Sequence, residues 1–268
     1  MAQSINTNLM SLNAQRHLSS TQGAMATAME RLSSGLRVNS ARDDAAGLAI
    51  AERMHAQVRG MKVAIRNSND GISMAQVAEG GLNEVGNMLQ RMRELAVQSA
   101  NGTNSTSDRA NLNAEFTLLD TEIGRFTSSM RFNGLAILGA DAGTFTFQIG
   151  PNPSETMDIN TVAVAATGLN IATLADANTA ITGIDTAIDS MTTDRAMYGA
   201  SQSRFESAIA SLEIAVENQE AARGRIIDAD FAVETSNLTR AQILQQAGTA
   251  MVSQANQAPQ QVLSLLGG

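Results

Sequence analysis

The sequence predicts a mainly α-helical protein, a long antiparallel helical bundle or coiled coil that carries a small β-hairpin region. Apolar residues recur every three or four positions over long stretches, which is typical of helices that pack along one face. Only 3% of the residues are aromatic, which favours thin helical layers over one thick core. Both ends of the chain are poor in charge, so discontinuous N- and C-terminal halves are expected to pair.

The longest apolar stripe runs from Ile50 to Ala96 and predicts one long packed helix. Ser40 is expected to precede this helix, with Asp43 and Asp44 in its first turn, which is typical of a helix N-terminus. Inside a helix each glycine costs about 1 kcal/mol relative to alanine. The stripe contains five: Gly60, Gly71, Gly80, Gly81 and Gly86. The alternative is two helices broken near residues 67–71, but the stripe keeps its phase across the glycines, which favours one helix.

A second helix is expected to start with Ser107 as its N-cap, after Asn101–Gly102 ends the first helix. Further on, residues 144–149 and 157–162 alternate between apolar and polar types and are separated by a turn rich in Gly and Pro. This pattern predicts a β-hairpin on a helical protein.

Two more helices follow the hairpin. A third stripe of apolar residues extends from Ile181 to Gln219, and a final helix shows the same spacing from Leu244 to Leu265. Pro259 is expected to bend this last helix or to end a segment of it.

These elements predict three regions. Residues 1–42 and 228–268 are expected to form an inner domain of paired terminal helices. Residues 43–139 and 176–227 are expected to form a helical middle domain, and residues 140–175 are its β-hairpin region.

The composition excludes several functional classes. A net charge of −8 argues against nucleic acid as a partner. Without cysteine the chain has neither a disulfide framework nor a thiolate metal site. No apolar window is long enough for a transmembrane helix, so no membrane insertion is expected. The N-terminus lacks the features of a cleaved Sec signal, and these features alone would suggest the cytoplasm.

No arrangement of residues predicts catalysis, a cofactor or a metal site. His17 and His55 have no second His and no Cys at ligand spacing. Two carboxylate pairs could act as general acid and base or bind Ca²⁺, but no calcium-binding loop surrounds them. Helix capping or structural ion pairing is therefore favoured for six residues: Arg42, Asp43, Asp44, Arg225, Asp228 and Asp230.

The C-terminal segment, residues 241–268, contains no Asp, Glu, Lys or Arg and carries seven glutamines. Amide side chains hydrogen-bond without the desolvation cost of buried ions, so the segment suits packing against other copies of the chain. The alternatives are frayed tails, or a membrane-surface helix, which usually needs a Lys/Arg-rich face. The apolar positions expected to drive self-assembly are Ile5, Leu9, Leu12, Leu244, Met251, Val262 and Leu265.

Several segments of the chain resemble bacterial flagellin, the subunit of the flagellar filament. They include RLSSGLRVNSARDDAAGLAIAERM, QRMRELAVQSANGTNS, RIIDADFAVETSNLTR and QQAGTAMVSQANQAPQQVLSLLGG. The resemblance covers nearly the whole chain and implies a structural protein that polymerises for motility, in a short form without outer variable domains. It also implies an extracellular location, reached through the flagellar export channel without a cleaved Sec signal.

The resemblance implies partners as well. They are other copies of the chain, an export chaperone that binds the C-terminal segment, and the filament cap and hook-junction proteins. Many flagellins are also sensed by an animal Toll-like receptor, whose contact positions correspond here to Arg91, Leu95 and Glu115. For Leu95 the alternative is a packing role. For the whole chain, the alternatives are a hook–filament junction protein with flagellin-like ends and, from a different class, an enzyme on a helical scaffold.

Overall fold

The computed structural model describes the backbone of residues 7–266 and the side chains through residue 257, and the chain divides into two compact units. The terminal unit comprises Met1–Ala56 and Asn218–Gly268, and the middle unit comprises Gln57–Glu217. The sequence predicts a terminal region that ends at residue 42 and resumes at residue 228. The terminal unit extends further into the chain, to Ala56 on one side and from Asn218 on the other. The predicted mainly helical fold with one small hairpin is confirmed.

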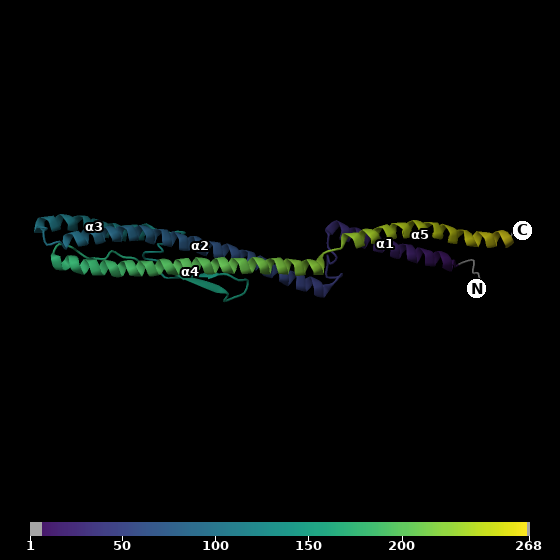
Figure 1. Cartoon of the computed structure of the whole chain (residues 1–268). Helices are drawn as coiled ribbons and strands as arrows, with labels where there is room; N and C mark the ends of the chain where they lie inside the picture. Colours follow the sequence, from purple (N-terminus) through teal and green to yellow (C-terminus); the bar gives the residue numbers. More distant parts are fainter. Residues whose placement is uncertain (1–6, 267–268) are drawn as a thin grey trace. The chain divides into compact units, whose positions relative to one another are not determined.

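The terminal unit is built on two long helices that lie side by side, α1 (Leu9–Ser34) and α5 (Phe231–Leu266) (Figure 1). Helix α1 ends at Gly35, whose φ of 71° is the left-handed conformation that glycine adopts without strain. Beyond it, a short antiparallel bridge joins Leu36 to Asp228. Buried Val38 and Ile227 pack together here with the first turns of α2, which close this end of the helix pair.

The middle unit contains most of α2 (Ala45–Ser99), α3 (Thr106–Ser129) and most of α4 (Leu174–Ile227). A hairpin of β1 (Thr144–Gln148) and β2 (Thr156–Asn160) lies along these helices (Figure 1). The strands are antiparallel, with Thr144 opposite Asn160. The hairpin is tied to the helices because the side-chain amide of Asn67 donates to the Gln148 carbonyl at 2.9 Å. The rings of Phe147 and Phe205 also meet edge to face, 5.7 Å apart.

Helix α2 is continuous across its five glycines, as the unbroken phase of its stripe predicts. Two of these glycines allow close approach. A Cβ atom on Gly60 would lie 2.8 Å from the Cβ of Pro151 in the hairpin turn, and one on Gly71 would lie 2.8 Å from the Phe205 ring. Glycine therefore lets the hairpin and α4 reach the α2 backbone.

The predicted helix starts were wrong by a few residues. Helix α2 begins at Ala45, after Asp43 and Asp44 rather than before them, because the Asp43 carboxylate holds the Ser40 amide and hydroxyl in a turn. Helix α3 begins at Thr106, and its N-cap is Ser105 instead of Ser107.

Of the two outcomes expected at Pro259, an end to the last helix is wrong. Helix α5 continues through Pro259 and extends to Leu266, so the proline does not end it. The Ala255 carbonyl, to which Pro259 has no N–H to donate, accepts a hydrogen bond from the side chain of Asn8, and this bond compensates for the lost helical one.

Candidate assembly surface

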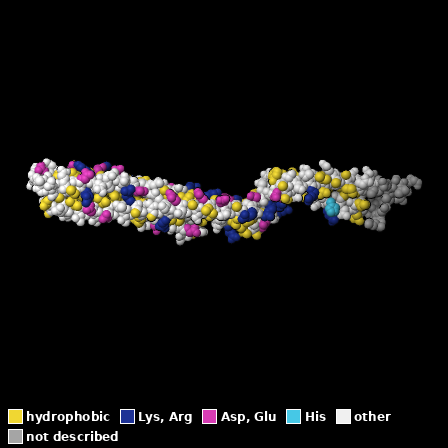
Figure 2. All heavy atoms as spheres, viewed as in Figure 1, with side chains coloured by type: hydrophobic (Ala, Val, Ile, Leu, Met, Phe, Trp, Pro, Cys, Tyr) yellow, Lys and Arg dark blue, Asp and Glu magenta, His cyan; other side chains and the backbone are white. Residues whose placement is uncertain are grey.

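The α1–α5 pair leaves large apolar side chains uncovered. Nine of them are between 48% and 71% exposed: Leu9, Met10, Leu12, Met29, Phe231, Val233, Ile243, Leu244 and Met251. Figure 2 shows hydrophobic side chains gathered over this pair, with few acidic ones among them on the face in view. Exposed apolar patches of this kind mark interaction surfaces in soluble proteins.

A groove of about 760 Å³ runs between α1 and α5. Met10 and Leu18 line it from α1, and Leu244 and Met251 line it from α5. The helices approach closely here because α5 carries Gly248, where a Cβ atom would lie only 3.2 Å from the Leu18 side chain. The groove therefore has an apolar floor and is open to a partner.

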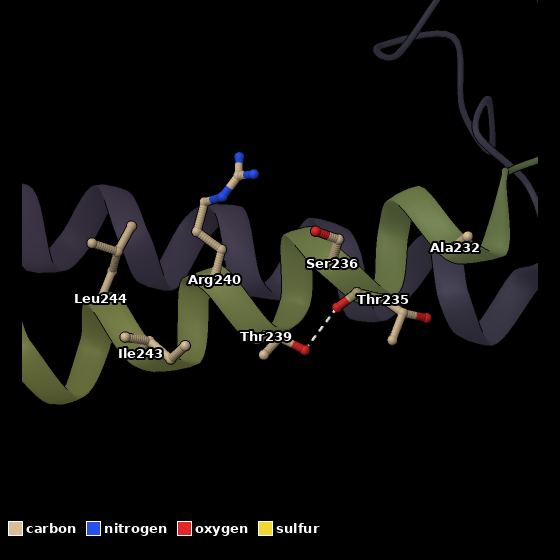
Figure 3. A pocket seen from close by; sticks show the side chains of 7 residues that line it. All are labelled: Ala232, Thr235, Ser236, Thr239, Arg240, Ile243 and Leu244. Atoms are coloured by element: carbon tan, nitrogen blue, oxygen red, sulfur yellow. Dashed lines mark hydrogen bonds between the residues drawn. The ribbon is translucent and has the colours of Figure 1, made fainter.

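A second, shallower groove of about 640 Å³ follows one side of α5 alone (Figure 3). Its seven lining residues all come from this helix, and Arg240 is the one charged residue among them. The Thr239 hydroxyl donates to the Thr235 backbone carbonyl at 2.9 Å. Its hydrogen is therefore already bonded within the helix. Ile243 and Leu244 lie together at one end of the groove and make that end apolar, while Ala232 lies at the other end (Figure 3).

Where the side chains of the α1–α5 pair are described, few polar contacts join the two helices. At one end, the Arg31 guanidinium donates to the Glu234 carboxylate at 3.1 Å, and Glu234 is only 7% exposed. Towards the chain ends, Asn8 donates to the Ala255 carbonyl at 2.7 Å, and the Ser11 hydroxyl donates to the Asn256 side chain at 2.7 Å. These contacts set how α1 lies along α5 and leave the apolar side chains free.

Four of the seven positions expected to drive assembly, Leu9, Leu12, Leu244 and Met251, are exposed on this pair. Ile5 lies outside the described residues, and Val262 and Leu265 lie outside the described side chains. Sequence reasoning did not single out Met10 and Ile243. Each stands next to a chosen position, so following a second apolar face of each helix would have found them.

Two of the carboxylates singled out in the terminal unit cap helices. Asp44 accepts from the Gly47 amide at 2.8 Å at the start of α2, and Asp230 accepts from the Ala232 and Val233 amides at the start of α5. The Ser40 hydroxyl and amide hold the pKa of Asp43 below its ordinary value.

Asp228 lies in the bridge to Leu36. In the described part of the chain, no ion pair joins Arg42 or Arg225 to these carboxylates. Residues 7–257 hold no cluster of three His, Asp or Glu side chains suited to a metal ion, and no described helix is long and apolar enough to cross a membrane.

The three positions of the expected receptor site differ in exposure. Arg91 donates to Glu115 at 2.8 and 3.0 Å and to Glu94 at 2.9 Å, and these hydrogen bonds raise the pKa of the Arg91 guanidinium, with Glu115 the largest cause. The Arg91 and Glu115 side chains are each about half exposed. Leu95 is only 1% exposed, because it packs with Phe116 in the core of the middle unit.

Comparisons with known proteins cover nearly the whole chain. A family model of the bacterial flagellin N-terminal helical region matches residues 5–142, and one of the bacterial flagellin C-terminal helical region matches residues 181–266. The flagellin of Halalkalibacterium halodurans is 46% identical over 98% of this chain and 99% of its own length. The flagellar filament 33 kDa core protein of Treponema phagedenis is 44% identical over 98% and 99%. The crystal structure of Bacillus cereus flagellin superposes with a TM-score of 0.51 at 30% identity, covering 55% of this chain and 88% of that one.

Proposed function

Because this chain belongs to the bacterial flagellin family, we propose that its α1–α5 pair is the surface through which it polymerises. Membership of this family establishes what the chain builds. It is a structural subunit of the flagellar filament, which lies outside the cell, and it is not an enzyme. Nothing among these relatives favours a hook–filament junction protein.

The uncovered apolar face of the helix pair carries this proposal. Burying one exposed Leu, Ile, Met or Phe side chain stabilises an interface by about 1.5–3 kcal/mol. From residue 241 to its end at Leu266, helix α5 carries no charged side chain. A partner can therefore cover this part of the helix without burying an unpaired ion. Other copies of the chain offer the same charge-poor, amide-rich helices as partners.

Removing residues 241–268 is expected to abolish polymerisation while the middle unit stays folded. The measurements are seeded filament growth by electron microscopy and helical content by circular dichroism. Normal filaments from the shortened chain would refute the proposed surface.

A pair of point variants tests the surface without removing a helix. Ile243 on α5 and Ile214 on α4 are both 61% exposed, so Ile243→Asp and Ile214→Asp add the same charge at equal exposure. We expect Ile243→Asp to stop seeded growth and Ile214→Asp to leave most of it. The opposite order would move the assembly surface to the middle unit.

The same charge-poor C-terminal segment serves export before assembly. In this proposal the chain leaves the cell through the flagellar export channel without a cleaved Sec signal, and an export chaperone covers residues 241–268 in the cytoplasm. Exposed Ile243 and Met251 support this, because apolar side chains without a partner promote aggregation. The chaperone should co-purify with the full chain and not with a chain lacking residues 241–268; equal recovery would contradict its binding there.

The filament cap and the hook-junction proteins are proposed to contact the same α1–α5 surface at the two ends of the filament. Such ends expose the helix pair of the terminal subunits, and proteins with similar helices can complete it. Purified junction protein should then seed growth of the wild-type chain and fail to seed Ile243→Asp. Equal seeding of both would separate the junction contact from this surface.

Recognition by a Toll-like receptor is proposed to involve Arg91 and Glu115, with Leu95 in a supporting role. The first two form an exposed ion pair across α2 and α3, and Leu95 lies in the core of the same unit. Arg91→Glu should reduce signalling in a receptor reporter assay, whereas Arg204→Glu on exposed α4 should not. No response to the wild-type monomer, or an equal loss with Arg204→Glu, would contradict the assignment.

A further inference from the structure

Pro259 creates an acceptor within α5. A proline has no backbone N–H, so it cannot donate to the carbonyl four residues earlier, which here is Ala255. Helix α5 nevertheless continues past this point to Leu266. A carbonyl without its helical partner inside a helix pair requires another donor.

Asn8 supplies that donor from the other helix. Its Nδ2 donates to the Ala255 carbonyl at 2.7 Å, a short and direct bond. Its Oδ1 accepts from the Ser11 amide at 3.1 Å, which makes the same side chain the N-cap of α1. One amide thus completes the start of α1 and the proline site of α5 at the same time.

A neighbouring contact extends this arrangement. The Ser11 hydroxyl donates to Oδ1 of Asn256 at 2.7 Å, and Ser11 is only 7% exposed. Between these bonds and the Arg31–Glu234 ion pair at the other end, the small residues and apolar side chains of the described interface would tolerate a shift of one helix along the other. The Asn8 side chain bonds one particular carbonyl, that of Ala255, and the Ser11 hydroxyl bonds one particular side-chain amide, that of Asn256. These two hydrogen bonds therefore distinguish one register from the next.

We propose that Asn8 is a positioning residue for filament assembly, and that the carbonyl freed by Pro259 is the site it recognises. Its bond fixes the register of α1 on α5, and only that register presents the apolar face of the pair as neighbouring subunits require. The inference rests on the proposed function of the pair as the assembly surface. Pro259 acts here by having no N–H for the Ala255 carbonyl, which leaves that carbonyl free to accept from Asn8.

A double-mutant cycle tests this coupling in the full chain. Asn8→Ser keeps a good N-cap but is too short to reach Ala255, and Pro259→Ala restores the missing N–H. The measurement is the critical concentration for growth from sheared filament seeds. Asn8→Ser alone should raise it about fivefold, the change that corresponds to about 1 kcal/mol. In the Pro259→Ala background, the same substitution should change it less than about twofold, because the Ala255 carbonyl no longer depends on Asn8.

Each outcome decides the proposal. Equal effects of Asn8→Ser in both backgrounds, or no effect in either, would overturn it, since Asn8 would then act only as a cap or not at all. If Asn8→Ser fails to grow, growth of the double variant supports the coupling and its failure contradicts it. Ile243→Asp separates the two hypotheses: normal growth of that variant refutes the assembly surface itself, whereas its loss together with an uncoupled Asn8 refutes the positioning role alone.

Discussion

Replacing Asp120 should destabilise the middle unit more than any other single carboxylate substitution we consider. Asp120 lies on α3, is 8% exposed, and accepts three hydrogen bonds from the extended segment after the hairpin. The Thr167 amide and hydroxyl donate to Oδ1 at 2.6 and 2.8 Å, and the Gly168 amide donates to Oδ2 at 3.0 Å. Gly168 has a φ of 63°, so the chain turns sharply around this carboxylate.

The magnitude follows from these three bonds. A hydrogen bond to a charged group contributes about 1.5–3 kcal/mol, and bonds that share one acceptor group are not additive. We therefore expect Asp120→Ala to lower the free energy of unfolding by about 4 kcal/mol, a large part of the 5–15 kcal/mol typical of a domain. Asp120→Asn should cost about half as much, because its amide keeps the two bonds from Thr167 and faces Gly168 with a second donor.

Urea unfolding of the monomer, followed by circular dichroism, measures the change, and Asp189→Ala is the matched control. Asp189 is exposed on α4, so its substitution carries the same change in helix propensity without the three bonds. Hydrogen exchange should also show lost protection at Thr167 and Gly168 in Asp120→Ala. The reasoning would be refuted if Asp120→Ala came within about 0.5 kcal/mol of Asp189→Ala.

Three further predictions concern the same unit. Gly71→Ala should lower the free energy of unfolding by about 1–3 kcal/mol, because its Cβ would lie 2.8 Å from the Phe205 ring. Gly80→Ala has nothing within 4 Å of its Cβ and should raise the free energy of unfolding by up to about 1 kcal/mol. Thermal unfolding compares the two variants, and a change in the same direction for both would contradict the packing argument. Burial raises the pKa of Tyr198 to about 12, so the stability that its neutral form contributes is complete below the unfolded pKa of about 10 and is lost as pH rises from there through 12. Absorbance of the tyrosinate reports it cleanly, since the chain has one Tyr and no Trp, and titration near pH 10 in the folded protein would contradict it. The Ser105 hydroxyl lowers the pKa of Asp108 at the start of α3. The stability that the ionised Asp108 contributes is therefore present above the unfolded pKa of about 3.9 and is lost as pH falls through the lower folded value. Asp108→Asn should flatten that part of the curve of melting temperature against pH, and an unchanged slope would count against the cap.

Long-period patterns in the sequence predicted the regular elements well, and local side-chain geometry decided where the predictions were wrong. The stripe from Ile50 to Ala96 kept its phase across the glycines, and the helix is continuous. The helix starts were misplaced because serine is compatible with several cap positions. Only the pairing of Ser105 with Asp108, in which each side chain bonds the other's backbone, selects one start.

Contacts between residues far apart in the sequence could not be predicted from periodicity. Asp120 occupies a helix position that gives no indication of burial, and its donors lie 47 and 48 residues further along the chain. The role of Asn8 is similarly hidden, since its acceptor is 247 residues away. Leu95 shows the reverse problem, because a match to a family's sequence pattern does not indicate whether a side chain faces solvent or the core.

The two units obtain their stability in different ways, and this difference explains the composition of the chain ends. The middle unit buries Tyr198, Phe116, Phe205 and many Leu, Ile and Met side chains almost completely, so its helices complete a core within one chain. Within the described part of the α1–α5 pair, the buried residues are Ser11, Ala28, Glu234 and Ala241, while its large apolar side chains remain exposed. Two helices can cover only one stripe of each other, and in the assembly that we propose the remaining apolar faces gain their free energy of burial from neighbouring subunits. A charge on those faces would oppose assembly, which is a physical reason for a C-terminal segment made of amides, small residues and aliphatic side chains.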